Sequence, residues 1–447
     1  MKSVKITNFL ILILFIQSSV GFAQDNSQIM TDAYNKIWSA EVQQGIDERI
    51  EKNRKADVVL KIQDIKSGSQ VTVEQLSHDF VFGSNIFLFG QFENTKENAK
   101  YEALFTDLFN AATVPFYWKT LEPKRGELRF SKNSSHIYRR PPVDPVVEFC
   151  LKNGINMNGH AIIYGMRRWG HPEWMPEERS AMEPIFENHI RELAERYGSK
   201  IQRWDVVNEP IDQANRGVMP DDYTFKSFKW AEKYFPDNAL FNLNDCDMNW
   251  EAAPVRRYVE IIRNLKDRGS KIDITGIQSH IFNPKGAKAI AEGEDRLTPN
   301  KIGELLNILD EAELPIHISE VTISAPDTTK AGGKVQAQIA RNLYRYWFSH
   351  PSIMGITWWN AVDGGAAEGE PSFSGILDEN LNQKPVYDVL KDLIFNEWHT
   401  KLQAKISNDN SIQFRGFKGK YRISWRAKDG KSRERIIDIT QNTDIKI

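Results

Sequence analysis

The sequence predicts an α/β fold in which eight parallel strands close into a (β/α)8 barrel, the TIM barrel. Three observations predict it: short apolar runs recur from residue 78 onward, amphipathic stretches separate most of them, and a polar residue follows each run. Parallel strands buried on both faces are near-continuous apolar runs, and their neighbours are joined by crossover helices. The expected strands cover residues 79–84, 111–118, 155–163, 203–208, 239–244, 272–279, 316–321 and 353–359.

Helical spacing of apolar residues between these runs predicts the crossover helices. The clearest of them cover residues 183–197, 251–268, 300–312 and 334–349. An open, doubly wound sheet shows the same alternation, but it carries a glycine-rich phosphate turn after its first strand. No such turn follows residues 79–84, so we prefer the closed barrel, over residues 78–398.

Both ends of the chain lie outside this barrel. Residues 1–23 combine two lysines, an apolar run and a small-residue site ending at Ala23, which predicts a secretory signal peptide and export to the periplasm or beyond the cell. Residues 24–77 predict a helix over 28–54 and a β-hairpin of strands 57–63 and 70–76. Residues 399–447 predict a short β extension that pairs with this hairpin. No other segment is apolar enough to enter a membrane.

Composition narrows the class of partner. The formal net charge of −2 argues against a nucleic acid, because phosphate binding requires a concentrated basic face. The 12 tryptophans are compatible with stacking on sugars as well as with core packing.

The cysteines and histidines indicate neither a disulfide nor a metal site. Cys150 and Cys246 are expected to be buried free thiols. The histidines lack metal-ligand spacing, so neither a metal nor another cofactor is expected. The oligomeric state is not predicted.

Two of the polar residues that follow the strands are glutamates. Glu209 ends the fourth expected strand and Glu320 ends the seventh. In a closed barrel the strand ends meet at one mouth, so we expect the two carboxylates about 5–5.5 Å apart, the separation that a retaining glycosidase uses. Two such residues by themselves are weak evidence for catalysis. Six other strand ends also carry polar groups: Asn85, Lys119, His160, Asp245, His280 and Asn360.

Several motifs resemble those of glycoside hydrolase family 10, best known for endo-β-1,4-xylanases. They are EPKRGEL (122–128), GHAII (159–163), WDVVNEP (204–210), NDCD (244–247), GIQSHI (276–281), HISE (317–320) and GITWWN (355–360). The resemblance covers residues 75–398. It implies an exported β-glycoside hydrolase that acts on xylan or a similar polysaccharide.

The resemblance also implies roles for single residues. Glu209 matches the general acid/base and Glu320 the nucleophile, and Asn208 matches the residue that holds the sugar 2-hydroxyl. The residues that match or are expected to make other substrate contacts are His160, Gln278, His280, Trp359, Tyr164 and Trp118. Of the adjacent Trp358 and Trp359, only one can face the lumen, because side chains alternate along a strand. The resemblance selects Trp359.

The sequence departs from the family pattern around this centre. Thr113, Val114 and Tyr117 stand where the family carries polar sugar ligands, and Thr322 replaces an acidic residue. Tyr164 replaces a tryptophan, and stacking of Tyr164, Trp169 and Trp174 on sugar is as plausible as ordinary packing. The polar loop 131–145 and the glycine-rich loop 362–375 are further features, and the second is expected to cover the site. These departures predict the same bond chemistry on a different or more decorated glycan.

Two alternatives stay open at this point. A carbohydrate-binding protein on a degenerate barrel is favoured by the missing sugar ligands but does not require two catalytic glutamates. A metal hydrolase is disfavoured by the histidine spacing. Reducing ends released from a panel of glycans would separate an enzyme from a binder.

Overall fold

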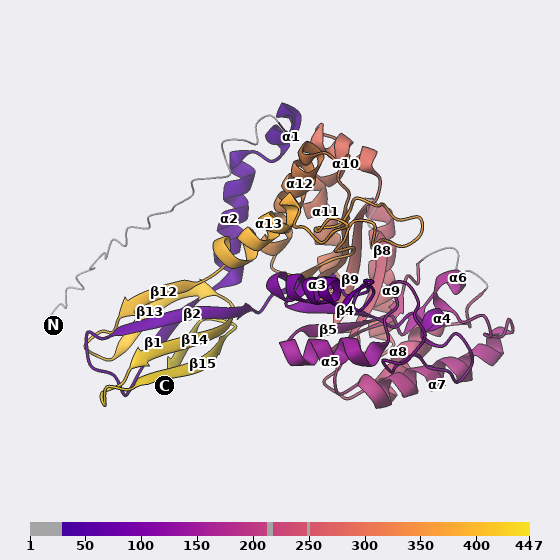
Figure 1. Ribbon diagram of the computed structural model, residues 1–447, viewed down its shortest axis with the longest axis horizontal. Helices are drawn as coiled ribbons and strands as arrows, with labels where there is room; N and C mark the ends of the chain where they lie inside the picture. Colours follow the sequence, from indigo (N-terminus) through magenta and orange to yellow (C-terminus); the bar gives the residue numbers. More distant parts are fainter. Residues whose placement is uncertain (1–28, 212–217, 248–250) are drawn as a thin grey trace.

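The computed structural model describes residues 29–211, 218–247 and 251–447. The chain forms two bodies, a barrel with its ring of helices and a β-sandwich beside it (Figure 1). The expected signal peptide, residues 1–23, lies outside the described residues. No helix in the described ranges combines the length and apolar character that crossing a bilayer requires.

The larger body is the predicted parallel barrel. Its strand order is β5-β4-β3-β11-β10-β9-β8-β7, and pairing of β5 with β7 closes the ring. The short β6 (Ile163–Tyr164) pairs with the end of β7. The barrel strands are β3 (Val81–Asn85), β4 (Ala111–Pro115), β5 (Asn156–His160), β7 (Arg203–Asn208), β8 (Leu240–Asp247), β9 (Ile274–Ile281), β10 (Ile316–Ile323) and β11 (Ile353–Trp358).

Helices surround the barrel and cover the outer faces of its strands. Each buries an apolar stripe: in α9, for example, Val255, Tyr258 and Ile262 are buried at helical spacing. The helices are α3 (Thr95–Leu108), α4 (Trp118–Leu121), α5 (Val143–Asn153), α6 (Arg167–Gly170), α7 (Arg179–Tyr197), α8 (Tyr223–Tyr234), α9 (Ala252–Asp267), α10 (Pro284–Ala291), η3 (Asp295–Leu297), α11 (Pro299–Asp310), α12 (Lys330–Ser349), α13 (Pro385–Asp392) and the π-helical turn η4 (Leu393–Glu397).

Two helices precede the first strand and pack on the barrel. They are α1 (Asp32–Ile37) and α2 (Ala40–Arg54), and α2 lies along α12. The buried amide of Asn342 on α12 donates to the Tyr34 hydroxyl at 2.9 Å. At the end of α2 the Arg54 guanidinium donates to the carbonyl of Ile353 at 2.7 Å. The N-terminal helices are therefore attached to the barrel before the chain enters the sandwich.

The smaller body is a β-sandwich built from both ends of the chain. One sheet has the order β13-β1-β16 and the other the order β12-β2-β14-β15. The strands are β1 (Lys55–Lys61), β2 (Gln70–His78), β12 (Lys401–Lys405), β13 (Ser411–Phe417), β14 (Gly419–Arg426), β15 (Ser432–Ile439) and β16 (Thr443–Lys446). The predicted pairing of the C-terminal extension with the N-terminal strands is confirmed, because β1 pairs with β13 and β2 with β12 and β14.

The predicted hairpin between the two N-terminal strands is wrong. Both strands form, but β1 and β2 lie in different sheets. Val58 on β1 and Val73 on β2 bury their side chains in one shared core, together with Ile412 and Ile423 from the C-terminal strands. Strands that share a core across two sheets face each other and do not pair edge to edge. The segment 62–69 is therefore an arch between sheets.

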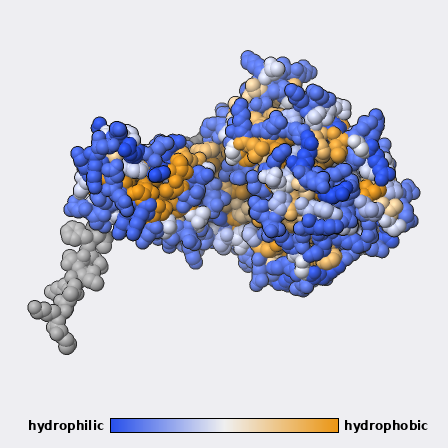
Figure 2. Space-filling model, turned by 90° about the horizontal axis from the view of Figure 1, so that it is seen from below, coloured by the Kyte–Doolittle hydropathy of each residue, from blue (hydrophilic) through white to orange (hydrophobic). Residues whose placement is uncertain are grey.

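The two bodies have separate cores. The sandwich core is distinct from the barrel core. Seen from below, the surface is mostly hydrophilic, and hydrophobic colour gathers over part of the sandwich and in patches over the barrel (Figure 2). Leu76 and Ile436 are exposed large apolar residues of the sandwich. Cys150 is a buried free thiol, as expected, whereas the side chain of Cys246 lies outside those described.

Candidate active site

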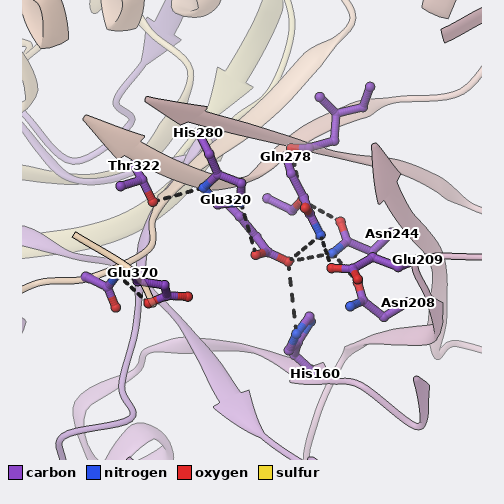
Figure 3. A network of polar contacts seen from close by, with 12 residues as sticks. His160, Asn208, Glu209, Asn244, Gln278, His280, Glu320, Thr322 and Glu370 are labelled. Carbon is purple, nitrogen blue, oxygen red and sulfur yellow. Dashed lines mark hydrogen bonds and ion pairs between the residues drawn. The ribbon is translucent and has the colours of Figure 1, made fainter. Parts of the chain in front are cut away.

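The two glutamates predicted to act together lie at one mouth of the barrel. The Gln278 amide nitrogen donates to Oε1 of Glu209 at 3.0 Å and to Oε1 of Glu320 at 3.1 Å (Figure 3). One nitrogen can reach both oxygens only when those oxygens lie within about 6 Å of each other, which is shorter than the ~6.5–9.5 Å separation of inverting glycosidases. The geometry therefore matches two carboxylates that act on one anomeric carbon without a water molecule between them.

Strand register places the neighbours of this pair. Across the ladder between β9 and β10, Gln278 stands opposite Glu320 and His280 opposite Thr322. On the other side of the barrel, Asn208 stands opposite Asn244. Paired residues of adjacent strands project to the same side of a sheet. These side chains therefore meet in the barrel lumen although they come from four different strands.

Glu320 is surrounded by hydrogen-bond donors. Its Oε1 accepts from the Asn244 amide at 2.8 Å as well as from Gln278. His280 Nε2 lies 3.6 Å from Oε2, and His160 Nε2 lies 4.0 Å from Oε1. An ionised carboxylate only accepts hydrogen bonds, so this environment suits its anionic form.

Burial has the opposite effect on Glu320. It is the main cause that raises the pKa of Glu320 to about 8, with a further contribution from the Glu209 carboxylate. His160 and the Asn244 amide act against this increase. Two interacting carboxyl groups titrate as a pair. In the protein without substrate, burial therefore keeps a proton on Glu320 up to near neutral pH, against the hydrogen-bond donors that favour its anion.

Glu209 is positioned by its backbone and by a tyrosine. Its φ angle is 55°, in the left-handed region that residues other than glycine rarely adopt, and its N–H donates to the carbonyl of Asn244 at 2.8 Å. The Tyr164 hydroxyl donates to Oε2 at 2.7 Å. Unusual backbone conformations of this kind concentrate at functional sites. Tyr164, expected to contact sugar, thus contacts the Glu209 carboxylate.

A buried chain of hydrogen bonds orients His160. Its Nδ1 lies 2.7 Å from Asp205, and its Nε2 lies 3.2 Å from the Tyr117 hydroxyl. Burial lowers the pKa of His160, but the hydrogen bond to Asp205 and the nearby Glu320 carboxylate outweigh burial, so the pKa is raised. Asp205 also accepts from the amides of Asn158 and Asn242. His160 therefore presents a positively polarised edge toward Glu320.

The two adjacent tryptophans at the end of β11 face opposite ways. Trp358 is fully buried, and its indole N–H donates to the carbonyls of Asn360 and Ser374. The Trp359 ring meets His160 edge to face, with ring centroids 5.3 Å apart. This placement puts Trp359 next to His160, whose Nε2 lies 4.0 Å from Glu320.

Trp118 does not lie in this centre, which corrects the sequence expectation. Its ring stacks on His189 with centroids 3.8 Å apart, and its indole N–H donates to the buried Glu122 at 2.7 Å. Trp118 belongs to α4 and packs in the main core, because the strand expected to run to residue 118 ends at Pro115. Trp174 also packs there, edge to face with Trp118, and the side chain of Trp169 is not among those described.

Asn244 is the main residue of the centre that sequence reasoning missed. Its amide nitrogen donates to both Asn208, at 2.7 Å, and Glu320. The Ser319 hydroxyl donates to its oxygen, which orients the amide. Asp245, the residue expected to face the mouth, instead accepts from the backbone N–H of Ile211 at 2.7 Å. Side chains alternate along β8, so Asn244 and Asp245 project to opposite sides of the strand and only one of them can enter the lumen.

Thr322 stands two residues after Glu320, where the family pattern has an acidic residue. Its hydroxyl lies 2.9 Å from Nδ1 of His280. The His280 ring also stacks on Phe282, with centroids 4.3 Å apart. Thr322 and Phe282 thus position the His280 ring, whose Nε2 lies toward Glu320. Within the described ranges, no three His, Cys, Asp or Glu residues are grouped so that they could hold a metal ion.

Comparison with known proteins places this geometry in a family. Residues 77–393 match the model of "Glycosyl hydrolase family 10". The chain is 26% identical over 398 residues to anti-sigma-I factor RsgI6 of Acetivibrio thermocellus, covering 85% of this chain but only 46% of that protein. It therefore spans about half the length of that relative. It is also 26% identical over 337 residues to endo-1,4-beta-xylanase B of Thermotoga neapolitana, covering 70% and 87% of the two chains.

Solved structures share the barrel. A family 10 structure from Paenibacillus barcinonensis superposes with a TM-score of 0.57 at 20% identity, over 71% of this chain and 95% of that one. Xylanase 10B from Thermotoga petrophila, solved with xylobiose, gives 0.57 at 22% identity, over 70% and 94%. Because the family model covers most of the chain and the paired glutamates stand at the expected strand ends, the chain belongs to glycosyl hydrolase family 10.

Proposed function

We propose that this chain is an exported, retaining β-glycoside hydrolase that cleaves β-1,4-xylan or a related xylan-like polysaccharide. The observation that carries the proposal is the pair Glu209 and Glu320, held close enough for one amide of Gln278 to reach both. The names of the xylanases among its relatives support the class of substrate.

The first step forms a sugar ester on the protein. Glu320 attacks the anomeric carbon while Glu209 donates a proton to the departing glycosidic oxygen. The bond from that carbon to the leaving oxygen breaks as the bond to the Glu320 oxygen forms. Asn208 lies beside Glu320 through Asn244, so its amide is available to the 2-hydroxyl of the sugar.

The second step releases the sugar. A water molecule enters where the leaving group stood, Glu209 removes its proton, and the oxygen attacks the anomeric carbon. The ester bond to Glu320 breaks and the carboxylate is restored. Two inversions at one carbon leave its configuration unchanged, so the first product formed from a β-glycoside is the β-anomer.

The donors around Glu320 support this division of roles. The amides of Asn244 and Gln278 and the two histidines stabilise charge on Glu320. Glu209 accepts from Tyr164 and is less deeply buried than Glu320. In the proposed mechanism Glu209 carries the proton that it donates to the leaving oxygen, and Glu320 acts as the anion.

Substitution of Glu320 tests the proposal. Glu320→Ala should abolish release of reducing ends from xylan and from an aryl β-xyloside, with the folded state retained. Glu122→Gln is the matched control, because Glu122 is a buried glutamate outside the pair, and it should remain active. Unchanged hydrolysis by Glu320→Ala would refute the assignment.

The same assay over a panel of glycans separates catalysis from binding. Retention of glycans without new reducing ends would instead indicate a carbohydrate-binding protein, the alternative suggested by the loss of polar ligands at Thr113 and Val114. Export is tested separately, by sequencing the N-terminus of the protein recovered outside the cytoplasm. The proposed signal peptide requires that the mature chain begin at Gln24.

A further inference from the structure

Two loops meet at the mouth of the barrel beside the catalytic pair. The Glu370 carboxylate accepts from Arg139 at 3.1 Å, from the Asn360 amide at 3.0 Å and from the N–H of Ala367 at 2.9 Å. Figure 3 shows Glu370 and Glu320 in one view of this mouth. The loop 362–375 is thus bound to the loop 131–145.

Two consecutive arginines of this junction differ in their partners. Arg139 is buried, and its charge is balanced by Glu370. Arg140 is half-buried and has no carboxylate within 4.0 Å in the part of the chain that the structure describes. Among the described residues, the one hydrogen bond of its guanidinium is to the carbonyl of Arg139, at 2.9 Å. Burial lowers the pKa of Arg140 to about 10, so the guanidinium is charged at neutral pH.

The guanidinium of Arg140 lies over an aromatic ring of the site. Its central carbon is 3.7 Å from the centroid of the Tyr117 ring. The hydroxyl of Tyr117 lies 3.2 Å from His160, and His160 lies 4.0 Å from Glu320. Two side chains, Tyr117 and His160, thus connect the Arg140 guanidinium to the proposed nucleophile Glu320.

A guanidinium stacked on a ring keeps its edge free for an anion. Stacking occupies the face of the group, whereas the N–H donors point outward in its plane and match the oxygens of a planar acid. Only one of the Arg140 nitrogens is engaged, with a backbone carbonyl.

We propose that Arg140 binds an anionic substituent, a carboxylate or a sulfate, on the glycan chain beside the cleavage point. The inference rests on the proposed hydrolase function and names the class of its substrate as an acidic glycan. Arg139 and Glu370 act as positioning residues, because they hold the loop that carries Arg140.

Matched substrates test this inference. Xylo-oligosaccharides that bear a uronic acid are compared with the same compounds after reduction of the carboxyl group to an alcohol, and with sulfated xylan. We expect wild type to prefer an anionic form over the neutral one by about tenfold in kcat/KM, the size of one charge-assisted hydrogen bond. The preferred anion identifies the source, carboxylate or sulfate.

Variants assign the preference to Arg140. Arg140→Met should bring the ratio of acidic to neutral substrate close to one, and Arg140→Lys should keep part of it. Arg268→Met is the matched control. Arg268 also lies 3.7 Å from a ring, that of Phe225, but it follows α9 at the opposite end of the barrel. This control should keep the wild-type ratio.

Two results would overturn the inference. Wild type could cleave acidic and neutral substrates equally well, or Arg140→Met could slow both equally, which would make Arg140 a mere support for Tyr117. If no substrate is cleaved, the hydrolase proposal fails instead. Calorimetric titration of wild type and Arg140→Met with the acidic and the reduced oligosaccharides then still decides whether Arg140 recognises the anion.

Discussion

Replacing Glu320 with glutamine should change how stability depends on pH. The pKa of Glu320 is raised by burial to about 8, above the ordinary value of 4.5 that applies in the unfolded chain. A carboxyl group with a raised native pKa favours the folded state below its unfolded pKa. This contribution is lost as the pH rises toward the native pKa.

The magnitude follows from these two values. Above pH 4.5 the unfolded state loses its proton while native Glu320 keeps it until near pH 8, at about 1.36 kcal/mol for each pH unit. Between pH 5 and 8 the wild type should therefore lose about 3 kcal/mol of unfolding free energy from this one group. Glu320→Gln has the same shape and no proton to lose, so it should not show this loss.

Urea unfolding of wild type and Glu320→Gln at pH 5 and pH 8 measures the effect. The variant should gain about 3 kcal/mol relative to wild type over this interval. Glu370→Gln is a control of opposite sign: although burial raises the pKa of Glu370, Arg139 and the hydrogen bonds to this carboxylate outweigh it and lower the pKa. Its stabilisation is present above pH 4.5 and is lost on acidification. Parallel pH curves for wild type and Glu320→Gln would refute the reasoning.

Three further predictions concern single contacts. Tyr164→Phe removes the hydroxyl that donates to Glu209 and should lower kcat/KM for xylan about tenfold; an unchanged rate would contradict this. Gly159→Ala would place a methyl group 2.3 Å from the ring of Trp204 and should cost about 1–3 kcal/mol in thermal unfolding. Gly286→Ala on α10 is the control and should cost nothing, because its methyl group would make only ordinary contacts, at 3.7 Å or more. Ile423→Ala should cost about 2–5 kcal/mol in the sandwich core while aryl glycoside hydrolysis by the barrel survives, and joint loss of both would show that the two bodies unfold together.

The barrel could be predicted because its signal is local. All eight expected strands form. A stretch such as 203–208 is buried on both faces of the sheet, so its apolar residues can be recognised without knowing which strands it pairs with. The strand ends predict that Glu209 and Glu320 face one mouth, and the resemblance to the family motifs then implies their catalytic roles. The strand expected over residues 111–118 ends at Pro115, and Trp118 begins the helix α4. The expected position of Trp118 was wrong for the same reason.

The sandwich and the loop junction could not be predicted in the same way. Alternation in 57–63 and 70–76 identifies two strands but does not say which strands they pair with. Their partners lie more than 300 residues away in the sequence. The contact of Arg139 with Glu370 likewise joins two loops 231 residues apart. Only the closed barrel brings such loops together, and neither loop carries a periodic signal.

The proposed division of roles between the two glutamates is tested most directly by trapping the sugar ester. An activated 2-deoxy-2-fluoro-β-xyloside slows release of the sugar, so the labelled protein can be digested and the modified residue identified by mass spectrometry. We predict one sugar per chain, bound to Glu320. A label on Glu209, or turnover of the substrate with no covalent label and with inversion at the anomeric carbon, would contradict the mechanism.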